Sequence, residues 1–245
     1  MKKTAPSISA AILLLCMVLL PACSQLGSSA NSAPVKQTRI DLLGTVISIT
    51  LYEDVDEKVF DEAFAIVADI DARMSTNNAS SEILALGHES GRRAVAVSED
   101  TYQLIERAIG YSELCEGAFD ITIGSVMQLW KTGAAFDTLP DDAAILNHLP
   151  LVNYKNIILS DDGVLLAKEG MQIDLGAIAK GYACDMVLDF LKSRGIKTAL
   201  LDFGGNIYVL GEKAEGSTWK LGIRSPIVGE NEIVCTVAVK NASIG

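Results

Sequence analysis

Apolar and polar residues repeat with two different periods along this chain, and the two periods predict both strands and helices. Residues 45–51 alternate with a period of two, so three aliphatic side chains share one face, as in a half-buried strand. Residues 56–74 and 100–115 place apolar side chains three or four positions apart, as amphipathic helices do. The pattern predicts further strands at 94–97, 157–159, 164–167, 219–223 and 233–239, and short helices at 82–86, 125–131 and 138–147. The chain therefore predicts an α+β fold.

The stretch IDLGAIAKGYACD, residues 173–185, predicts a junction between a strand and a helix. The strand is predicted to end at Asp174, Gly176 permits a tight turn, and helical spacing then runs to a stop at Gly195. Such a junction brings the Asp174 carboxylate, free helix N–H groups and Lys180 to one edge. There the positive end of the helix dipole favours a phosphate. An ordinary capped joint between strand and helix is equally consistent with the pattern, with Lys180 as a solvated helix lysine.

After this helix, an apolar run at residues 198–210 predicts another strand, which Gly204 and Gly205 interrupt. Glycines inside a strand mark either a bulge or the close approach of a ligand. The order strand, helix, strand predicts a right-handed crossover with parallel pairing.

The N-terminal residues predict a targeting segment. Lys2 and Lys3 precede an apolar run that is too short to span a membrane comfortably. The run ends just before Cys23, and this arrangement resembles a bacterial lipobox, whose cysteine is acylated. A plain secretory signal with cleavage elsewhere is the alternative. We predict a palmitoylated Cys23 and a location on the extracytoplasmic, periplasmic face of the cell membrane. The predicted parts are a lipoprotein signal peptide at 1–22, a flexible tether at 23–38 and one domain at 39–245.

Composition narrows the classes of function. The net charge of −11 disfavours nucleic acid as a partner, because a phosphate backbone needs a basic face. Two histidines, both in polar segments, do not suggest a multi-histidine metal site, and no acyl-transfer elbow, phosphate loop or Rossmann motif is found. The remaining candidates are Asp120, Asp174 and the two glycines at 204–205, which suit a hard cation held by oxygen ligands. An N-cap is the alternative for Asp120, and Cys184, on the buried side of its helix, is predicted to be inert.

Five motifs in order make the chain resemble the ApbE family of FAD:protein FMN transferases, which are bacterial lipoproteins. They are LGT at 43–45, MST at 74–76 with SE at 81–82, GAFDIT at 117–122 running to LW at 129–130, the central IDLGAIAKGYACD, and FGGN at 203–206. The resemblance implies an α+β domain with a mixed sheet and packed helices.

The resemblance also implies an activity. The family transfers FMN from FAD to a threonine or serine hydroxyl of an acceptor protein, releases AMP and requires Mg²⁺. Flavin-carrying subunits of membrane redox complexes would be the acceptors, and water in place of the hydroxyl would give FAD pyrophosphatase activity. The implied FAD contacts are Leu43, Asn77, Ala118, Phe119, Asp120, Asp174 and Lys180, and the backbone carbonyl of Ala177 is the implied Mg²⁺ ligand. Phe119 also suits a plain core position. A non-catalytic lipoprotein that stores or delivers FAD is the alternative.

Two departures from the family pattern affect these expectations. Many relatives carry an aromatic residue where this chain has Asn77, which implies weaker stacking on the nucleotide. The family's remaining Mg²⁺ ligands, an Asp and a nearby Thr or Ser, are expected beyond Gly245, as is a histidine linked to catalysis. The resemblance therefore implies a C-terminally truncated domain with impaired activity.

Overall fold

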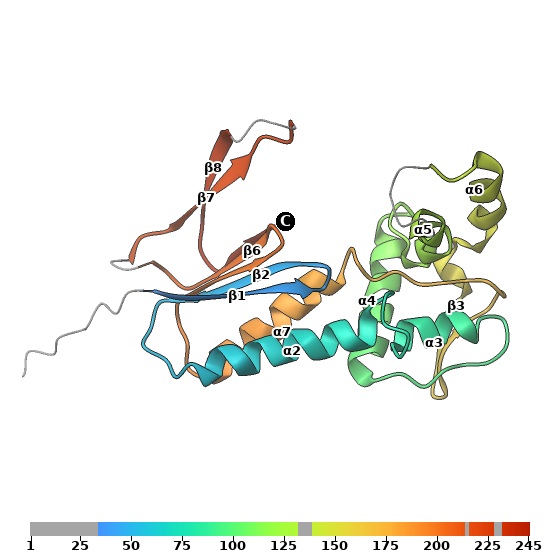
Figure 1. Ribbon diagram of the computed structural model, residues 1–245, viewed down its shortest axis with the longest axis horizontal. Helices are drawn as coiled ribbons and strands as arrows, with labels where there is room; N and C mark the ends of the chain where they lie inside the picture. Colours follow the sequence, from blue (N-terminus) through green and yellow to red (C-terminus); the bar gives the residue numbers. More distant parts are fainter. Residues whose placement is uncertain (1–33, 132–138, 214–215, 228–231) are drawn as a thin grey trace, which may run out of the picture. The chain divides into compact units, whose positions relative to one another are not determined.

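The computed structural model describes residues 34–131, 139–213, 216–227 and 232–245. The predicted signal peptide, Cys23, most of the predicted tether and Thr138, the first residue of the short helix predicted at 138–147, lie outside these ranges. The described residues form helices and antiparallel sheets (Figure 1), so the predicted α+β class is confirmed. None of the helices in these ranges combines the length and apolar composition needed to span a bilayer.

The largest sheet has five strands in the order β1-β2-β5-β6-β9, and each neighbouring pair is antiparallel. The strands are β1 (Val35–Leu42), β2 (Thr45–Leu51), β5 (Ala199–Phe203), β6 (Asn206–Leu210) and β9 (Ala242–Ile244). Strand β1 begins inside the segment predicted as a tether, so residues 35–38 belong to the sheet. Its side chains are mostly exposed and polar, and pairing with β2 rather than burial holds it in place.

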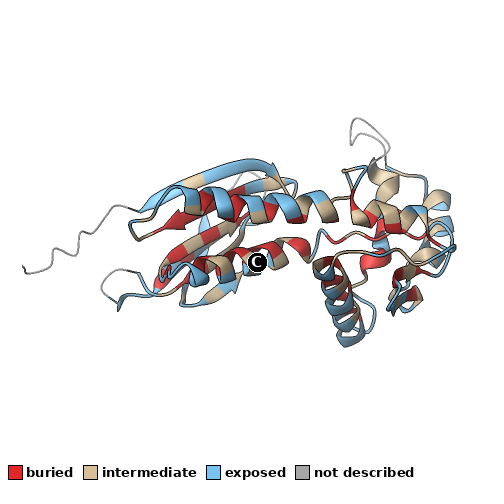
Figure 2. Cartoon of the chain, turned by 90° about the horizontal axis from the view of Figure 1, so that it is seen from below, coloured by how far each residue is buried: buried red, intermediate tan, exposed pale blue. Residues whose placement is uncertain are grey.

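Helices α2 (Lys58–Met74) and α7 (Ala179–Ser193) cover one face of this sheet (Figure 1). Ile47, Ile49 and Leu51 of β2 are fully buried beneath them, as the alternation predicts. Each such side chain contributes about 1.5–3 kcal/mol through burial. Figure 2 shows the buried residues on the sides of helices and strands that face one another.

A hairpin of β7 (Trp219–Arg224) and β8 (Ile233–Val239) packs on the opposite face of the sheet. There Trp219 joins Val209 of β6 in a second, smaller hydrophobic cluster, which also contains Leu200 of β5. Because neighbouring residues of a strand point to opposite faces, β5 and β6 contribute to both clusters. The start of β7 therefore covers part of the second face of the sheet.

The remaining elements lie between α2 and α7 in the sequence. They are α3 (Glu82–His88), α4 (Glu99–Leu114), α5 (Gly124–Lys131), α6 (Asp142–His148), the hairpin of β3 (Ile157–Ser160) and β4 (Gly163–Leu166), and short 3₁₀ turns at Ile121–Ile123, Leu149–Leu151 and Tyr154–Asn156. The helices predicted here are confirmed to within a few residues. The helix predicted at 138–147 begins later, at Asp142, with Asp141 as its N-cap. The strand predicted at 94–97 is wrong, because only an isolated bridge joins Val95 to Val164.

The strand predicted to end at Asp174 is also wrong. Strand β4 ends at Leu166, and residues 171–175 run without strand pairing. Met171, Ile173 and Leu175 are nevertheless buried, and the N–H of Asp174 donates to the carbonyl of Ile121 at 2.8 Å. Packing against this neighbouring segment therefore produces the alternation that reads as a strand.

Helix α7 ends at Ser193, and Gly195, the predicted stop, follows the C-cap with a φ of 80° in the left-handed region. The N–H of Gly195 donates to the carbonyl of Lys192 at 2.9 Å, and the N–H of Ile196 donates to that of Leu191 at 3.0 Å. This pair of hydrogen bonds is a Schellman motif.

Gly204 and Gly205 form the two-residue turn of a hairpin between β5 and β6, not a bulge within one strand. Their φ values of 68° and 94° are positive, as a type I′ hairpin turn requires. Because β6 turns back on β5, and β5 pairs antiparallel with β2, the predicted parallel crossover is wrong.

This turn predicts unequal effects for two alanine substitutions. Both glycines have positive φ, so alanine at either position costs about 1–2 kcal/mol. At Gly204 a Cβ would also overlap Thr45, approaching its Cβ and Cγ2 to 2.9 Å, whereas at Gly205 the nearby space is open. We expect Gly204→Ala to destabilise the protein by about 1–3 kcal/mol more than Gly205→Ala in urea unfolding. Equal losses would contradict this account of the turn.

Candidate ligand-binding site

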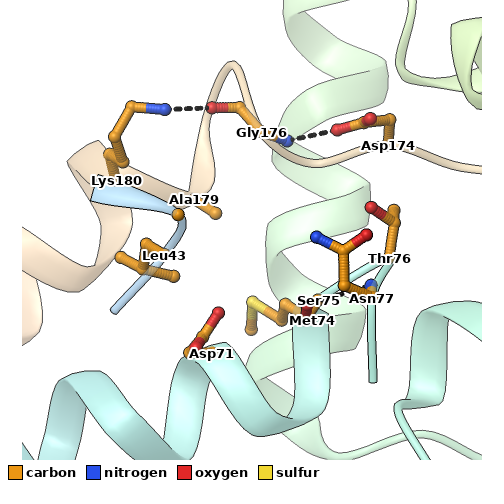
Figure 3. Close-up of a pocket in the computed structure, with 11 residues that line it drawn as sticks. Leu43, Asp71, Met74, Ser75, Thr76, Asn77, Asp174, Gly176, Ala179 and Lys180 are labelled. Carbon is orange, nitrogen blue, oxygen red and sulfur yellow. Dashed lines mark hydrogen bonds between the residues drawn. The ribbon is translucent and has the colours of Figure 1, made fainter. Parts of the chain in front are cut away.

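A pocket of about 120 Å³ with a mixed polar and apolar lining lies where the start of α7 meets the end of α2 (Figure 3). It brings together residues from three separate segments: Leu43 and Gly44 between β1 and β2, the end of α2 and the residues after it (Asp71 and Met74 to Asn77), and Asp174, Gly176, Ala179 and Lys180 around the start of α7. Four of the residues predicted to contact FAD therefore line one pocket: Leu43, Asn77, Asp174 and Lys180.

The backbone of Gly176 connects two of the three charged side chains of this pocket, Asp174 and Lys180. Its N–H donates to Asp174 Oδ1, and its carbonyl accepts from Lys180 Nζ, both at 2.8 Å (Figure 3). A Cβ at this position would lie 2.9 Å from Asp174 Oδ1, so glycine permits the close turn. The turn thus holds an ammonium group in the first turn of α7, where the positive end of the helix dipole also favours an anion.

A second pocket, of about 270 Å³, shares Lys180 with the first, so the two are adjacent. Its lining comes from α7 and the residues before it, from β6 and from the β9 end of the chain: Ala177, Lys180, Gly181, Cys184, Asp185, Asn206, Ile207, Tyr208, Ser243, Ile244 and Gly245. Burial, with a smaller contribution from Asp185, raises the pKa of the Cys184 thiol to about 12. The thiol is therefore protonated at neutral pH, as the prediction of an inert residue requires.

The structure offers few protein ligands for Mg²⁺. Within the described ranges, no three His, Cys, Asp or Glu side chains are grouped so that they could hold a metal ion. Nucleotide-bound Mg²⁺ needs few of them, since it is held mainly by phosphates and water with one or two protein groups. Ala177, whose carbonyl is the predicted ligand, and Asp185 both line the second pocket, and they fit this limited role.

Asp120 is engaged in local structure and is not among the residues that line either pocket. Its Oδ1 accepts hydrogen bonds from the N–H and Oγ1 of Thr122 at 2.9 and 2.6 Å, and its Oδ2 accepts from the N–H of Tyr154 at 2.8 Å. The alternative prediction of an N-cap is therefore confirmed. Asp120 is nevertheless connected to the first pocket, since the carbonyl of the next residue, Ile121, accepts from the N–H of Asp174.

The two residues before Asp120 also lie outside the lining of both pockets. Ala118 is exposed, and Phe119 is half-buried with its ring edge-on to Tyr111 at a centroid distance of 6.4 Å. Their predicted contact with the flavin nucleotide remains a prediction. Sequence reasoning did not identify Asp71 or Tyr208 as pocket residues, because each lies in a regular helix or strand where its spacing carries no chemical signal.

The fold and these pockets define an α+β protein with two adjacent pockets at the N-terminus of a helix, which share Lys180 as their one cationic residue. A sequence model of the ApbE family matches residues 43–245, and the chain belongs to the ApbE family. A relative from Klebsiella pneumoniae named FAD:protein FMN transferase is 32% identical over 205 residues, which cover 83% of this chain and 63% of the relative. A relative of the same name from Treponema pallidum is 30% identical over 239 residues, covering 89% and 66%. The chain thus spans a little under two thirds of the length of these relatives.

Solved structures share the fold. The ApbE protein from Thermotoga maritima aligns with a TM-score of 0.78 at 27% identity, covering 86% of this chain and 69% of that chain. The flavin transferase ApbE from Vibrio cholerae aligns with a TM-score of 0.73 at 24% identity, covering 86% and 70%, and supports the fold alone. The predicted ApbE-like fold is confirmed.

Proposed function

We propose that the protein transfers FMN from FAD to a threonine or serine hydroxyl of an acceptor protein and releases AMP. The observation that carries this proposal is the position of Lys180, which lines two adjacent pockets. FAD consists of two nucleotide halves joined by a diphosphate, so a cation shared by two hollows suits its shape and charge. The names of the relatives from Klebsiella pneumoniae and Treponema pallidum support the same activity.

The residues of the site suit a displacement at phosphorus. The acceptor hydroxyl attacks the phosphorus of the FMN half and loses its proton to solvent, the bond from that phosphorus to the bridging oxygen breaks, and AMP leaves with the bridging oxygen. Lys180 and the α7 N-terminus would bind the diphosphate and offset the charge that grows on the leaving oxygen. Asp174 would hold the turn at Gly176 that positions Lys180. Mg²⁺, held by the diphosphate, water and the Ala177 carbonyl, would supply further positive charge. Water in place of the hydroxyl would give FAD pyrophosphatase activity.

The experiment incubates the full-length protein with FAD, Mg²⁺ and a purified flavin-carrying subunit of a membrane redox complex. We expect AMP and an acceptor whose mass rises by one FMN group, and we expect EDTA to abolish both products. Reversible FAD binding without AMP would instead support the alternative of a lipoprotein that stores or delivers FAD.

Asn77 predicts a substitution that improves binding. It lies exposed in the lining of the first pocket, where an aromatic ring could stack on a nucleotide base. We expect Asn77→Tyr to tighten FAD binding by about tenfold, because stacking of one base on an aromatic ring contributes about 1–3 kcal/mol. Flavin fluorescence titration measures the affinity, and AMP release without acceptor, which should slow, measures hydrolysis. Ala79→Tyr, two residues further on and also exposed, is the control. Unchanged affinity and hydrolysis in Asn77→Tyr would refute the stacking argument.

The proposal includes a lipid anchor at Cys23 on the periplasmic face of the membrane, with flavin-carrying subunits of membrane redox complexes as acceptors. Each buried CH₂ of an acyl chain contributes about 0.8 kcal/mol, so several chains hold a protein firmly. We expect Cys23→Ser to abolish incorporation of labelled palmitate and to move the protein from the membrane to the soluble fraction. Cys16→Ser, inside the predicted signal peptide, should still incorporate palmitate and should stay in the membrane fraction. A Cys23→Ser protein that still incorporates palmitate would contradict the assignment.

A further inference from the structure

The connection between α2 and α3 supplies part of the lining of the first pocket. We call it the 75–81 loop, from the residues it comprises, and its first three residues, Ser75, Thr76 and Asn77, line the pocket (Figure 3). A loop of this kind has no ladder of backbone hydrogen bonds to hold it in one conformation. Its conformation therefore depends on side-chain hydrogen bonds, which Ser and Asn readily form with nearby backbone groups.

Both ends of the 75–81 loop are attached to one residue, Ser98, the N-cap of α4. Arg73, in the last turn of α2, donates from Nη1 to Ser98 Oγ at 2.7 Å. Glu82, in the first turn of α3, accepts at Oε1 from the N–H of Ser98 and at Oε2 from Ser98 Oγ, both at 2.9 Å. The helix ends on either side of the loop are thereby held at a fixed separation, so the loop needs only local contacts to take one conformation.

Asn78 supplies those local contacts. Its Nδ2 donates to the carbonyl of Ala72, in the last turn of α2, at 2.8 Å. Its Oδ1 accepts from the N–H and Oγ of Ser80 at 3.1 and 2.8 Å, and its backbone carbonyl accepts from the N–H of Ser81 at 2.9 Å. The last four carbonyls of a helix lack intrahelical partners, so the bond to Ala72 also satisfies the end of α2. Only a side chain with both a donor and an acceptor can make this set of contacts.

Asn78 does not itself line either pocket, whereas its neighbour Asn77 lines the first. The Asn77 N–H donates to Ser75 Oγ at 3.1 Å, and the Asn78 side chain turns back to α2, so residue 77 lies between two anchored residues. Residue 77 is thus held at the pocket before any ligand binds. A loop that is ordered before binding reduces the entropy that binding costs.

We propose that Asn78 is a positioning residue that acts through Asn77: its hydrogen bonds to Ala72 and Ser80 hold the 75–81 loop so that residue 77 faces the ligand. The proposal rests on the proposed function, because it takes the ligand of the first pocket to be FAD. Asn78→Ala removes the three side-chain hydrogen bonds and leaves the attachment of the loop ends to Ser98 intact. Residues 75–77 would then have to become ordered when FAD binds.

The first test measures FAD affinity by fluorescence titration of the full-length protein. We expect Asn78→Ala to bind FAD about tenfold more weakly than the wild type. The control is Asp56→Ala, at the opposite end of α2, where an exposed carboxylate outside both pocket linings accepts from the N–H of Lys58 at 3.0 Å. This variant should lose a local hydrogen bond and keep its FAD affinity. Unchanged affinity in Asn78→Ala, or an equal loss in Asp56→Ala, would overturn the proposal.

A double substitution separates a positioning role from a merely structural one. Asn77→Tyr is expected to tighten FAD binding about tenfold, because its ring stacks on a base. In an Asn78→Ala background the ring is no longer held at the pocket, so we expect most of this gain to disappear. A general loss of stability would leave the gain unchanged, because the effects of independent residues add. The same gain in both backgrounds would therefore overturn the role assigned to Asn78.

Amide hydrogen exchange without ligand tests the loop itself. The Asn77 N–H donates to Ser75 and not to Asn78, so its exchange reports on the loop and not on the deleted bonds. We expect faster exchange of this amide in Asn78→Ala than in the wild type or in Asp56→Ala. Unchanged exchange there would overturn the proposal. Failure of the wild type to make AMP would overturn the proposed function, and exchange at Asn77 would still decide whether Asn78 holds the loop.

Discussion

Replacement of Lys180 by methionine is expected to lower the rate of FMN transfer by about 100-fold, the effect of removing one preorganised group that stabilises transition-state charge. Methionine retains most of the aliphatic stem and removes the ammonium group. That group donates to the Gly176 carbonyl, and Lys180 lines both pockets. None of the other residues that line these two pockets is a lysine or an arginine. Release of AMP with FAD and a protein acceptor measures the rate, and flavin fluorescence measures affinity.

The matched control for this substitution lies on the same helix. Lys192→Met removes a cation from the last turn of α7, where the side chain is exposed and pairs with Asp189 at 3.3 Å. We expect wild-type transfer, because an exposed ion pair contributes little to stability and lies at the opposite end of the helix. Equal losses in Lys180→Met and Lys192→Met would show a general effect of helix charge and contradict the assigned role.

Gly124→Ala is expected to produce the second large effect, a loss of both stability and FAD affinity. A Cβ at Gly124 would lie 2.7 Å from the Ile173 carbonyl carbon and 2.8 Å from the Gln172 carbonyl oxygen. Backbone atoms cannot rotate away as a flexible side chain can, so the segment that precedes Asp174 must shift. Such overpacking costs about 1–3 kcal/mol. Urea unfolding measures the loss of stability. FAD titration measures the loss of affinity that a displaced Asp174 would cause.

Gly110→Ala tests whether the loss at Gly124 follows from this close contact. Gly110 lies inside α4 with nothing near its missing Cβ. Alanine in a helix interior is favoured over glycine by about 0.5–1 kcal/mol, so we expect a small gain in stability and unchanged FAD affinity. A Gly124→Ala protein as stable as the wild type would show that the two segments are not packed as described.

Local patterns predicted the helices well and the pairing of strands poorly. The spacing of apolar residues in α2, α4 and α7 depends only on the helix itself and on one buried face, so the sequence contains the whole signal. Strand β1 was not predicted because it is a largely exposed edge strand whose hydrogen bonds to β2 leave no apolar periodicity. Residues 171–175 alternate between apolar and polar side chains as a strand would, but they form no strand. The alternation arises because tertiary packing buries every second side chain.

The Gly204–Gly205 turn was predictable in principle. Two consecutive glycines between apolar runs are typical of a type I′ hairpin turn. A hairpin joins two antiparallel strands, as β5 and β6 are, so this interpretation would argue against the predicted parallel crossover. It was overlooked because the two strands together read as one long apolar run.

Half of the predicted site converges in the structure. Leu43, Asn77, Asp174 and Lys180 lie far apart in the sequence, and the family resemblance, not their spacing, predicted that they act together. The residues around Asp120 were grouped with them by the same resemblance, and the structure instead uses the Asp120 carboxylate to cap a short turn next to the pocket. Sequence patterns cannot distinguish a carboxylate that binds a ligand from one that caps a turn, because both follow a loop and precede a helix.

The most direct test of the central claim is a crystal structure of the full-length protein with FAD and Mg²⁺. We predict that the diphosphate lies within hydrogen-bonding distance of Lys180 Nζ at the start of α7, with one nucleotide half beside Asn77 and the other beside Tyr208. FAD bound elsewhere, with Lys180 still donating only to Gly176 and both pockets free of nucleotide, would contradict the account.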